Sequence, residues 1–183
     1  CGTTPEHIRL LAEKVHGTGA PQRPDQIEPR LASSIAAVAM QQEPRPFLIG
    51  ERLNTQGSRN FKKLLLAEDY DRIADLAREQ MEGGAHGLDI CTALTERPDE
   101  KQLMQKVIKC LSTTVKAPFI IDSTEPDVIE TALKTAPGKC LINSTNLESG
   151  RAKADKIFSL GRKFNAAVIA LTIDEAGMAK TAA

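Results

Sequence analysis

Polar residues recur at regular intervals in this chain, each at or just after the end of a short apolar run. They are carboxylates, amides and a hydroxyl, with no histidine and no Cys–His pair among them: Glu51, Asn54, Asp89, Asp122, Ser123, Asn143 and Asp174. Such side chains accept and donate hydrogen bonds but form no nucleophile–base arrangement. They suit the recognition of a neutral, nitrogen-rich heterocycle with several N–H donors, and they do not suit a phosphate.

The apolar runs that precede these residues predict five strands: Phe47–Gly50, Gly87–Ile90, Phe119–Ile121, Cys140–Ile142 and Ala167–Leu171. The strand starts are on average about 30 residues apart, which is the length of a repeating βα unit. Segments with helical spacing lie between them, as in Ile73, Leu76 and Ala77. Runs this apolar are typical of parallel strands covered by helices. The chain is therefore predicted to be α/β.

Two architectures use such units, the open doubly wound sheet and the closed (β/α)8 TIM barrel. No G-x-G-x-x-G or G-x-x-x-x-G-K-[ST] motif follows any strand, which disfavours a nucleotide-binding open sheet. In a barrel, the carboxyl ends of all strands meet at one mouth, so the polar residues would line a single pocket. The sequence predicts a TIM barrel of which about five strands are present.

Strand-end polar residues can also cap helices or pair with neighbours. For Asp122 the capping role is disfavoured, because Thr124 and Asp127 form a capping-box pattern of their own. Three other carboxylates keep a structural alternative, as partners of an arginine or a backbone amide or as loop residues: Glu51, Asp89 and Asp174.

The composition excludes some classes of partner. The chain has 24 basic and 24 acidic residues, so no net charge attracts it to nucleic acid or to an anionic membrane. Aromatic residues make up only 3%, which disfavours stacking on single strands. The longest apolar run, Ile35–Met40, is too short to cross a bilayer. Four cysteines without a C-x-x-C pair indicate reduced thiols and a cytoplasmic protein.

The chain divides into three parts by pattern. Residues 1–15 predict one helix with an apolar face. Residues 16–46 contain five of the ten prolines and predict a linker, with a short helix around Ser33–Met40. Residues 47–183 carry the strand–helix rhythm.

Five motifs in this order resemble the pterin-binding barrels of cobalamin-dependent methionine synthases and related corrinoid-protein methyltransferases. The resemblance extends more weakly to dihydropteroate synthases. The motifs are Gly50–Ser58, Leu88–Ile90, Ile121–Ser123, Ile142–Ser144 and Thr172–Thr181. The resemblance implies that residues 47–183 are the N-terminal part of a pterin-binding barrel.

The first eight residues, CGTTPEHI, resemble the end of the homocysteine-binding barrel of the same family. In that family the run carries two of three zinc-binding cysteines. The resemblance implies that residues 1–15 end a homocysteine-binding domain and that Cys1 is a zinc ligand in a longer protein.

The function that the resemblance implies is methyl transfer from 5-methyltetrahydrofolate to cob(I)alamin, held on another domain or subunit, and then to homocysteine, giving methionine. The nucleophile is then the cofactor's cobalt, so no catalytic residue is expected here, and this chain alone is expected to be inactive. Asp122 and Asn143 would bond the pterin edge, while the rest shape the pocket: Glu51, Asn54, Asp89, Ser123 and Asp174. Two alternatives stay open, a methyltetrahydrofolate:corrinoid-protein methyltransferase of one-carbon catabolism and a non-catalytic folate-binding fragment.

Overall fold

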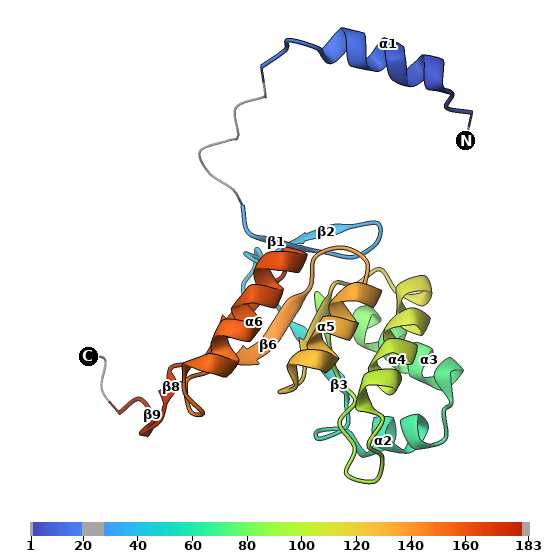
Figure 1. Cartoon of the computed structure of the whole chain (residues 1–183). Coiled ribbons are helices and arrows are strands. Elements are labelled where there is room, and N and C mark those ends of the chain that lie inside the picture. The colour runs from blue at the N-terminus through green and yellow to red at the C-terminus, as the bar shows by residue number, and fades with distance from the viewer. Residues whose placement is uncertain (1, 20–27, 181–183) are drawn as a thin grey trace.

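A parallel five-stranded sheet forms the centre of the molecule in the computed structural model, which describes residues 2–19 and 28–180 (Figure 1). Its strands are β3 (Ile49–Asn54), β4 (Gly87–Cys91), β5 (Phe119–Asp122), β6 (Leu141–Thr145) and β7 (Ala167–Ala170). They lie side by side in the order in which they occur in the chain. This confirms the predicted α/β class, and the strand ends differ from the prediction by a few residues.

Helices cover one face of this sheet (Figure 1). They are α2 (Arg59–Leu66), α3 (Tyr70–Glu82), α4 (Glu100–Thr114), α5 (Pro126–Thr135) and α6 (Arg151–Phe164). Their apolar stripes are buried against the strands, as Ile73, Leu103 and Ile129 illustrate. Parallel strands in chain order with helices on one face are successive units of a TIM barrel.

The two faces of each strand differ because successive side chains point in opposite directions. In β5, Phe119 and Ile121 belong to the core beneath the helices, whereas Ile120 belongs to a second cluster on the other face. Asp122 continues the alternation and follows Ile120 onto that inner face. The inner face is the one that lines the inside of a barrel.

A hairpin closes the amino ends of the strands. It pairs β1 (Arg30–Ala32) with β2 (Ala37–Ala39), so the predicted short helix around Ser33–Met40 is wrong. Leu31 is fully buried against Ile120 and Leu141, and this burial stabilises the extended form over the helix. The hairpin is also joined to the sheet by backbone hydrogen bonds between Ala32 and Lys139.

Gly138 shows how closely the hairpin lies against the loop before β6. A Cβ atom at this position would be only 2.3 Å from the carbonyl oxygen of Ala32. The residue also has a φ of +80°, a conformation that glycine adopts readily and other residues rarely do. Residues 30–40 are thus packed on the sheet, which the prediction of a linker through residue 46 did not anticipate.

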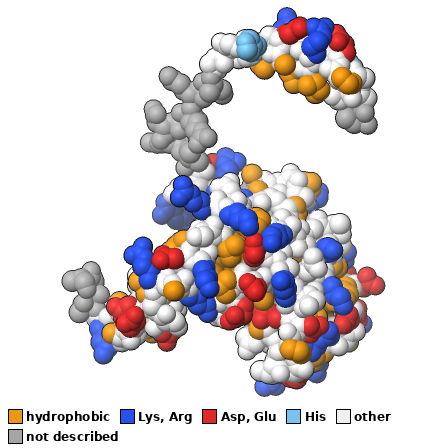
Figure 2. Space-filling view, viewed as in Figure 1, with side chains coloured by type: hydrophobic (Ala, Val, Ile, Leu, Met, Phe, Trp, Pro, Cys, Tyr) orange, Lys and Arg blue, Asp and Glu red, His pale blue; other side chains and the backbone are white. Residues whose placement is uncertain are grey.

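The predicted N-terminal helix is confirmed as α1 (Pro5–Val15), which buries none of its residues. Its apolar side chains Ile8, Leu11 and Val15 are all more than half exposed. Figure 2 shows hydrophobic side chains gathered along one side of this helix.

Beyond β7 the chain forms a small antiparallel pair, β8 (Ile173–Asp174) and β9 (Gly177–Met178). The backbone N–H of Leu147 donates to the carbonyl of Ile173, which holds this pair beside the loop after β6. In the described part of the chain, every helix is too short or too polar to cross a membrane.

Candidate pterin site

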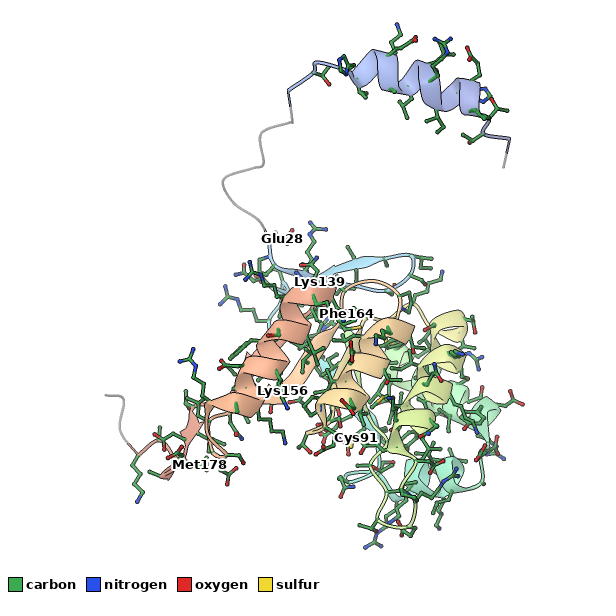
Figure 3. The ribbon with its side chains drawn as sticks, viewed as in Figure 1. Glu28, Cys91, Lys139, Lys156, Phe164 and Met178 are labelled. Atoms are coloured by element: carbon green, nitrogen blue, oxygen red, sulfur yellow. The ribbon has the colours of Figure 1, made fainter. Side chains whose placement is uncertain are left out.

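Four polar side chains meet on the inner face at the carboxyl ends of the strands. The residue before or after each of them packs beneath the helices: Leu53, Leu88, Ile90, Ile121 and Ile142. Alternation therefore turns Asn54, Asp89, Asp122 and Asn143 to the inner face. Asp122 and Asn143 are also direct partners in the register of β5 and β6. In Figure 3, Cys91 at the end of β4 and Lys139 before β6 mark the carboxyl and amino ends of the sheet.

Hydrogen bonds link these four residues into one cluster. The Asn54 Nδ2 group donates to Asp122 Oδ2 at 2.8 Å and to Asp89 Oδ2 at 3.1 Å. The Asn143 Nδ2 group donates to Asp89 Oδ1 at 3.2 Å. The Oδ1 atom of Asn54 accepts from the backbone N–H of Gln56 at 2.9 Å. The structure thus brings together residues that lie up to 89 positions apart in the sequence.

The cluster has a buried half and an accessible half. Asn54 and Asp89 are only 4% and 3% exposed, whereas Asp122 and Asn143 are half-buried. The half-buried pair lines a cavity of about 170 Å³, together with the loop after β6 and the first turn of α6. Of the four cluster residues, only Asp122 and Asn143 are therefore open to a ligand in the cavity.

Burial raises the pKa of the Asp122 carboxyl to about 6. The negative charges of Asp89, Glu51 and Glu100 act in the same direction, and the hydrogen bond from Asn54 opposes them. Burial likewise raises the pKa of Asp89, with opposition from its hydrogen bonds to Asn54 and Asn143. Two carboxylates close together in a partly dry site suit a ligand that brings N–H donors.

Ser123 lies outside the cavity. Its Oγ donates to Glu100 Oε1 at 2.9 Å and accepts from the backbone N–H of Glu125 at 3.2 Å. It therefore ties the loop after β5 to the start of α4. The predicted Thr124–Asp127 capping box is wrong, because α5 has Glu125 as its N-cap, with no side-chain cap bond.

Glu51 and Asp174 are not hydrogen-bonded into the cluster. Glu51 is exposed and lines a separate groove of about 550 Å³ beside β3 and α3, although its charge influences both aspartates. Asp174 is exposed in β8, where its Oδ1 accepts from the backbone N–H of Ala176 at 2.8 Å. Cys1 lies outside the described residues.

One wall of the cavity is formed by residues that were not predicted from the sequence, namely Asn146, Ser149 and Lys153. The available signal was the polar run between Thr145 and Gly150, directly after a strand end. In the described part of the chain, no three His, Cys, Asp or Glu side chains gather as a metal site would require.

Comparison with known proteins agrees with this geometry. Residues 50–183 match the family described as pterin binding enzyme. The chain is 40% identical over its whole length to the methionine synthase of Mycobacterium tuberculosis. It is 39% identical over 99% of its length to that of Mycobacterium leprae. The chain spans only 15% and 16% of the lengths of these two relatives.

Solved dihydropteroate synthases share the fold at low sequence identity. The Xanthomonas albilineans enzyme, in complex with indole-2-carboxylic acid and 6-chloroguanine, aligns with a TM-score of 0.58 and 18% identity, covering 84% of this chain and 53% of that one. The Yersinia pestis enzyme, in complex with a pterine–sulfa conjugate, aligns with a TM-score of 0.53 and 16% identity, covering 79% of this chain and 50% of that one.

The fold and the inward-facing polar cluster define a TIM-barrel protein of the pterin-binding type, and the chain belongs to the pterin-binding enzyme family. Within that family, the similarity that extends over the whole chain is to methionine synthases, which confirms the resemblance seen in the motifs.

Proposed function

We propose that this chain is the folate-binding module of a cobalamin-dependent methionine synthase. In the full-length protein it would bind 5-methyltetrahydrofolate, whose methyl group passes to cob(I)alamin on another domain or subunit and then to homocysteine, giving methionine. The observation that carries the proposal is the pair of accessible hydrogen-bonding groups, Asp122 and Asn143, in a cluster whose other members are already satisfied.

The unused atoms of the cluster complement a pterin edge. Both N–H groups of Asn54 are used within the protein, so this residue holds the site and is not available to a ligand. Among the described residues, Asp122 Oδ1 and Asn143 Oδ1 receive no hydrogen bond. A reduced pterin carries ring N–H and exocyclic amine groups along one edge, and these donors would pair with the two free acceptors.

The residues at the cavity bind and orient the substrate in this proposal, and no side chain here attacks the methyl group. The described lining contains neither cysteine nor histidine, which agrees with a nucleophile from elsewhere. A bound cobalamin would supply nucleophilic cobalt. Holding the pterin edge against Asp122 and Asn143 would fix where the methyl group points, and this positioning contributes to the rate.

The N-terminal segment supports the same assignment. We propose that α1 is the end of a homocysteine-binding domain, because its apolar face has no cover in the described part of the chain. Cys1 would be a zinc ligand of that domain in the full-length protein. The described residues do not themselves form a zinc site, so the other ligands would belong to that domain.

The cysteines described here are free, in agreement with a cytoplasmic protein.

Methyl transfer by the full-length protein tests the proposal. Under anaerobic conditions, 5-methyltetrahydrofolate should convert free cob(I)alamin to methylcobalamin, followed by its absorbance, and added homocysteine should then yield methionine. Methylation of cobalamin without methionine formation would favour the corrinoid-protein methyltransferase alternative. Folate binding without any methyl transfer would favour the non-catalytic alternative, and the absence of folate binding would overturn the assignment.

A further inference from the structure

We propose that Asp89 is a positioning residue that fixes the amide of Asn143 with its oxygen toward the ligand. This inference rests on the proposed function and deepens it, because it names the residue that decides which atom of Asn143 the pterin meets. Asp89 would act without touching the substrate, because both of its oxygens already accept hydrogen bonds within the protein.

The geometry around Asp89 restricts it to this role. The side chain is 3% exposed, and the cavity is lined by Asp122 and Asn143 but not by Asp89. Its Oδ1 accepts from Asn143 and its Oδ2 accepts from Asn54. In the register of the sheet, Asp89 pairs with Ile120, while Asp122 pairs with Asn143 one layer nearer the mouth. Asp89 therefore supports the accessible pair from below.

A carboxylate at this position selects one of two amide orientations. The Asn143 amide can rotate by about 180°, which exchanges its oxygen and its nitrogen at little steric cost. An ionised carboxylate only accepts hydrogen bonds, so it can face the NH2 group but repels the oxygen. Asp89 thus holds Oδ1 of Asn143 away from itself, as an acceptor for the N–H groups of the ligand.

The Asp89→Asn substitution should reverse that orientation. The oxygen of the new amide can still accept from Asn54, but its NH2 group then faces the NH2 group of Asn143. Rotation of Asn143 relieves this clash by turning its oxygen to the new amide and its NH2 group to the cavity. The ligand would meet a donor where it needs an acceptor, and one mispaired buried donor costs about tenfold or more in affinity.

A second substitution should restore the acceptor. In Asp89→Asn/Asn143→Asp, the new amide donates to the new carboxylate and still accepts from Asn54, so the cluster keeps its internal bonds and its total charge. The other carboxylate oxygen is then available to the ligand. Asn143→Asp alone places two carboxylates against each other and should also weaken binding.

The test is a calorimetric titration of 5-methyltetrahydrofolate into the full-length protein as wild type, both single variants and the double variant. Asp75→Asn, which removes an exposed carboxylate of α3, is the matched control and should bind like wild type. We expect each single variant to bind at least tenfold more weakly, and the double variant to bind at least tenfold more tightly than either. Melting curves identify any variant that does not fold.

The outcomes separate the two levels of the proposal. If wild type binds and Asp89→Asn binds equally well, or if the double variant is no better than the single variants, the positioning role is overturned while the proposed function stands. If Asp89→Asn does not fold, the comparison of the double variant with Asn143→Asp decides in the same way. If wild type itself does not bind 5-methyltetrahydrofolate, the proposed function is overturned and this inference with it.

Discussion

The two ends of the sheet are built from the same strands but differ in chemistry. At the amino end, Ile120 and Leu141 face inward and are covered by Leu31 of the hairpin. Two residues further along the same strands, Asp122 and Asn143 face inward instead. In TIM barrels the amino end stabilises the fold and the carboxyl end carries the function. Here the change from apolar to polar inward-facing side chains takes place within about 7 Å of strand.

The difference also shows what each end contributes to the folded state. Burial of apolar side chains at the amino end stabilises the fold, since it removes hydrocarbon from water. Burial of two carboxylates at the carboxyl end opposes folding, and the amides of Asn54 and Asn143 offset only part of the cost. The raised pKa of Asp122 is a sign of that remaining cost, which a ligand with N–H donors would relieve.

The largest effect should come from the amino end. Leu31→Ala removes a fully buried side chain and should lower the free energy of unfolding by about 2–5 kcal/mol, because a cavity remains beside Ile120. Affinity for 5-methyltetrahydrofolate should not change where the protein is folded. Urea unfolding and a ligand titration measure both, with Leu31→Met as a control of similar volume. A large loss of affinity in the folded variant would contradict the assignment of stability to the amino end and of ligand binding to the carboxyl end.

Asp122→Asn should have the opposite effects, with a large change in affinity and little change in stability. A carboxylate accepts from adjacent N–H donors, whereas an amide brings a donor that clashes with one of them, so affinity should fall tenfold to several hundredfold. The melting temperature without ligand should change little or rise, because a half-buried carboxylate is replaced by a neutral group. A titration and melting curves on the same samples test this. Unchanged affinity would mean that Asp122 is only a strand-end residue.

Asn143→Ala should weaken binding less than Asp122→Asn. It removes one neutral hydrogen bond to the ligand without introducing a repulsive group, so a loss of about two- to tenfold is expected. The same titration measures it. A loss greater than that of Asp122→Asn would assign the main contact to the amide and not to the carboxylate.

Binding should depend on pH through Asp122. With its pKa at about 6, the carboxyl is mostly ionised at pH 7 and mostly protonated at pH 5, so affinity should be about tenfold weaker at pH 5. Stability of the ligand-free protein should change in the other direction. Because the folded state binds the proton more tightly than the unfolded state, stability should fall as the pH rises from about 4 to about 6. Asp122→Asn should reduce the pH dependence of both affinity and stability. Titrations and melting curves of both proteins between pH 4 and pH 7.5 measure this, and an unchanged pH dependence in the variant would contradict the prediction.

The smallest effect on stability should come from Tyr70, which lies outside both ends of the sheet. The hydroxyl of Tyr70 is buried at the start of α3 and has no hydrogen-bond partner among the described residues. Tyr70→Phe removes this group, so the free energy of unfolding should stay the same or rise by up to about 1 kcal/mol. Urea unfolding measures the change. A loss of more than about 1 kcal/mol would show that the hydroxyl has a partner, such as water.

Sequence periodicity predicted the sheet well because each strand carries its own signal, namely an apolar run followed by a polar residue. It also predicted polar residues at the carboxyl end, since Asp122 and Asn143 come directly after the predicted apolar runs Phe119–Ile121 and Cys140–Ile142. The hairpin was mispredicted because Leu31 is stabilised in an extended form by Ile120 and Leu141, far away in the sequence. Local propensity carries no information about contacts with residues that are distant in the sequence.

The different roles of the residues within the site could not be predicted from the sequence either. Asn54 and Asp122 carry the same kind of signal, a polar residue at a strand end. Only the three-dimensional arrangement shows that both N–H groups of Asn54 are used internally while one oxygen of Asp122 receives no bond among the described residues. Ser123 likewise follows a strand directly but turns toward Glu100.

The most direct test of the central claim is a crystal structure of the full-length protein with 5-methyltetrahydrofolate bound. We predict that the pterin edge lies at the carboxyl ends of the strands, with N–H groups within hydrogen-bond distance of Asp122 and the Asn143 oxygen, while Asn54 and Asp89 keep their internal bonds. A pterin bound elsewhere, for example in the groove beside β3 and α3, would contradict the account.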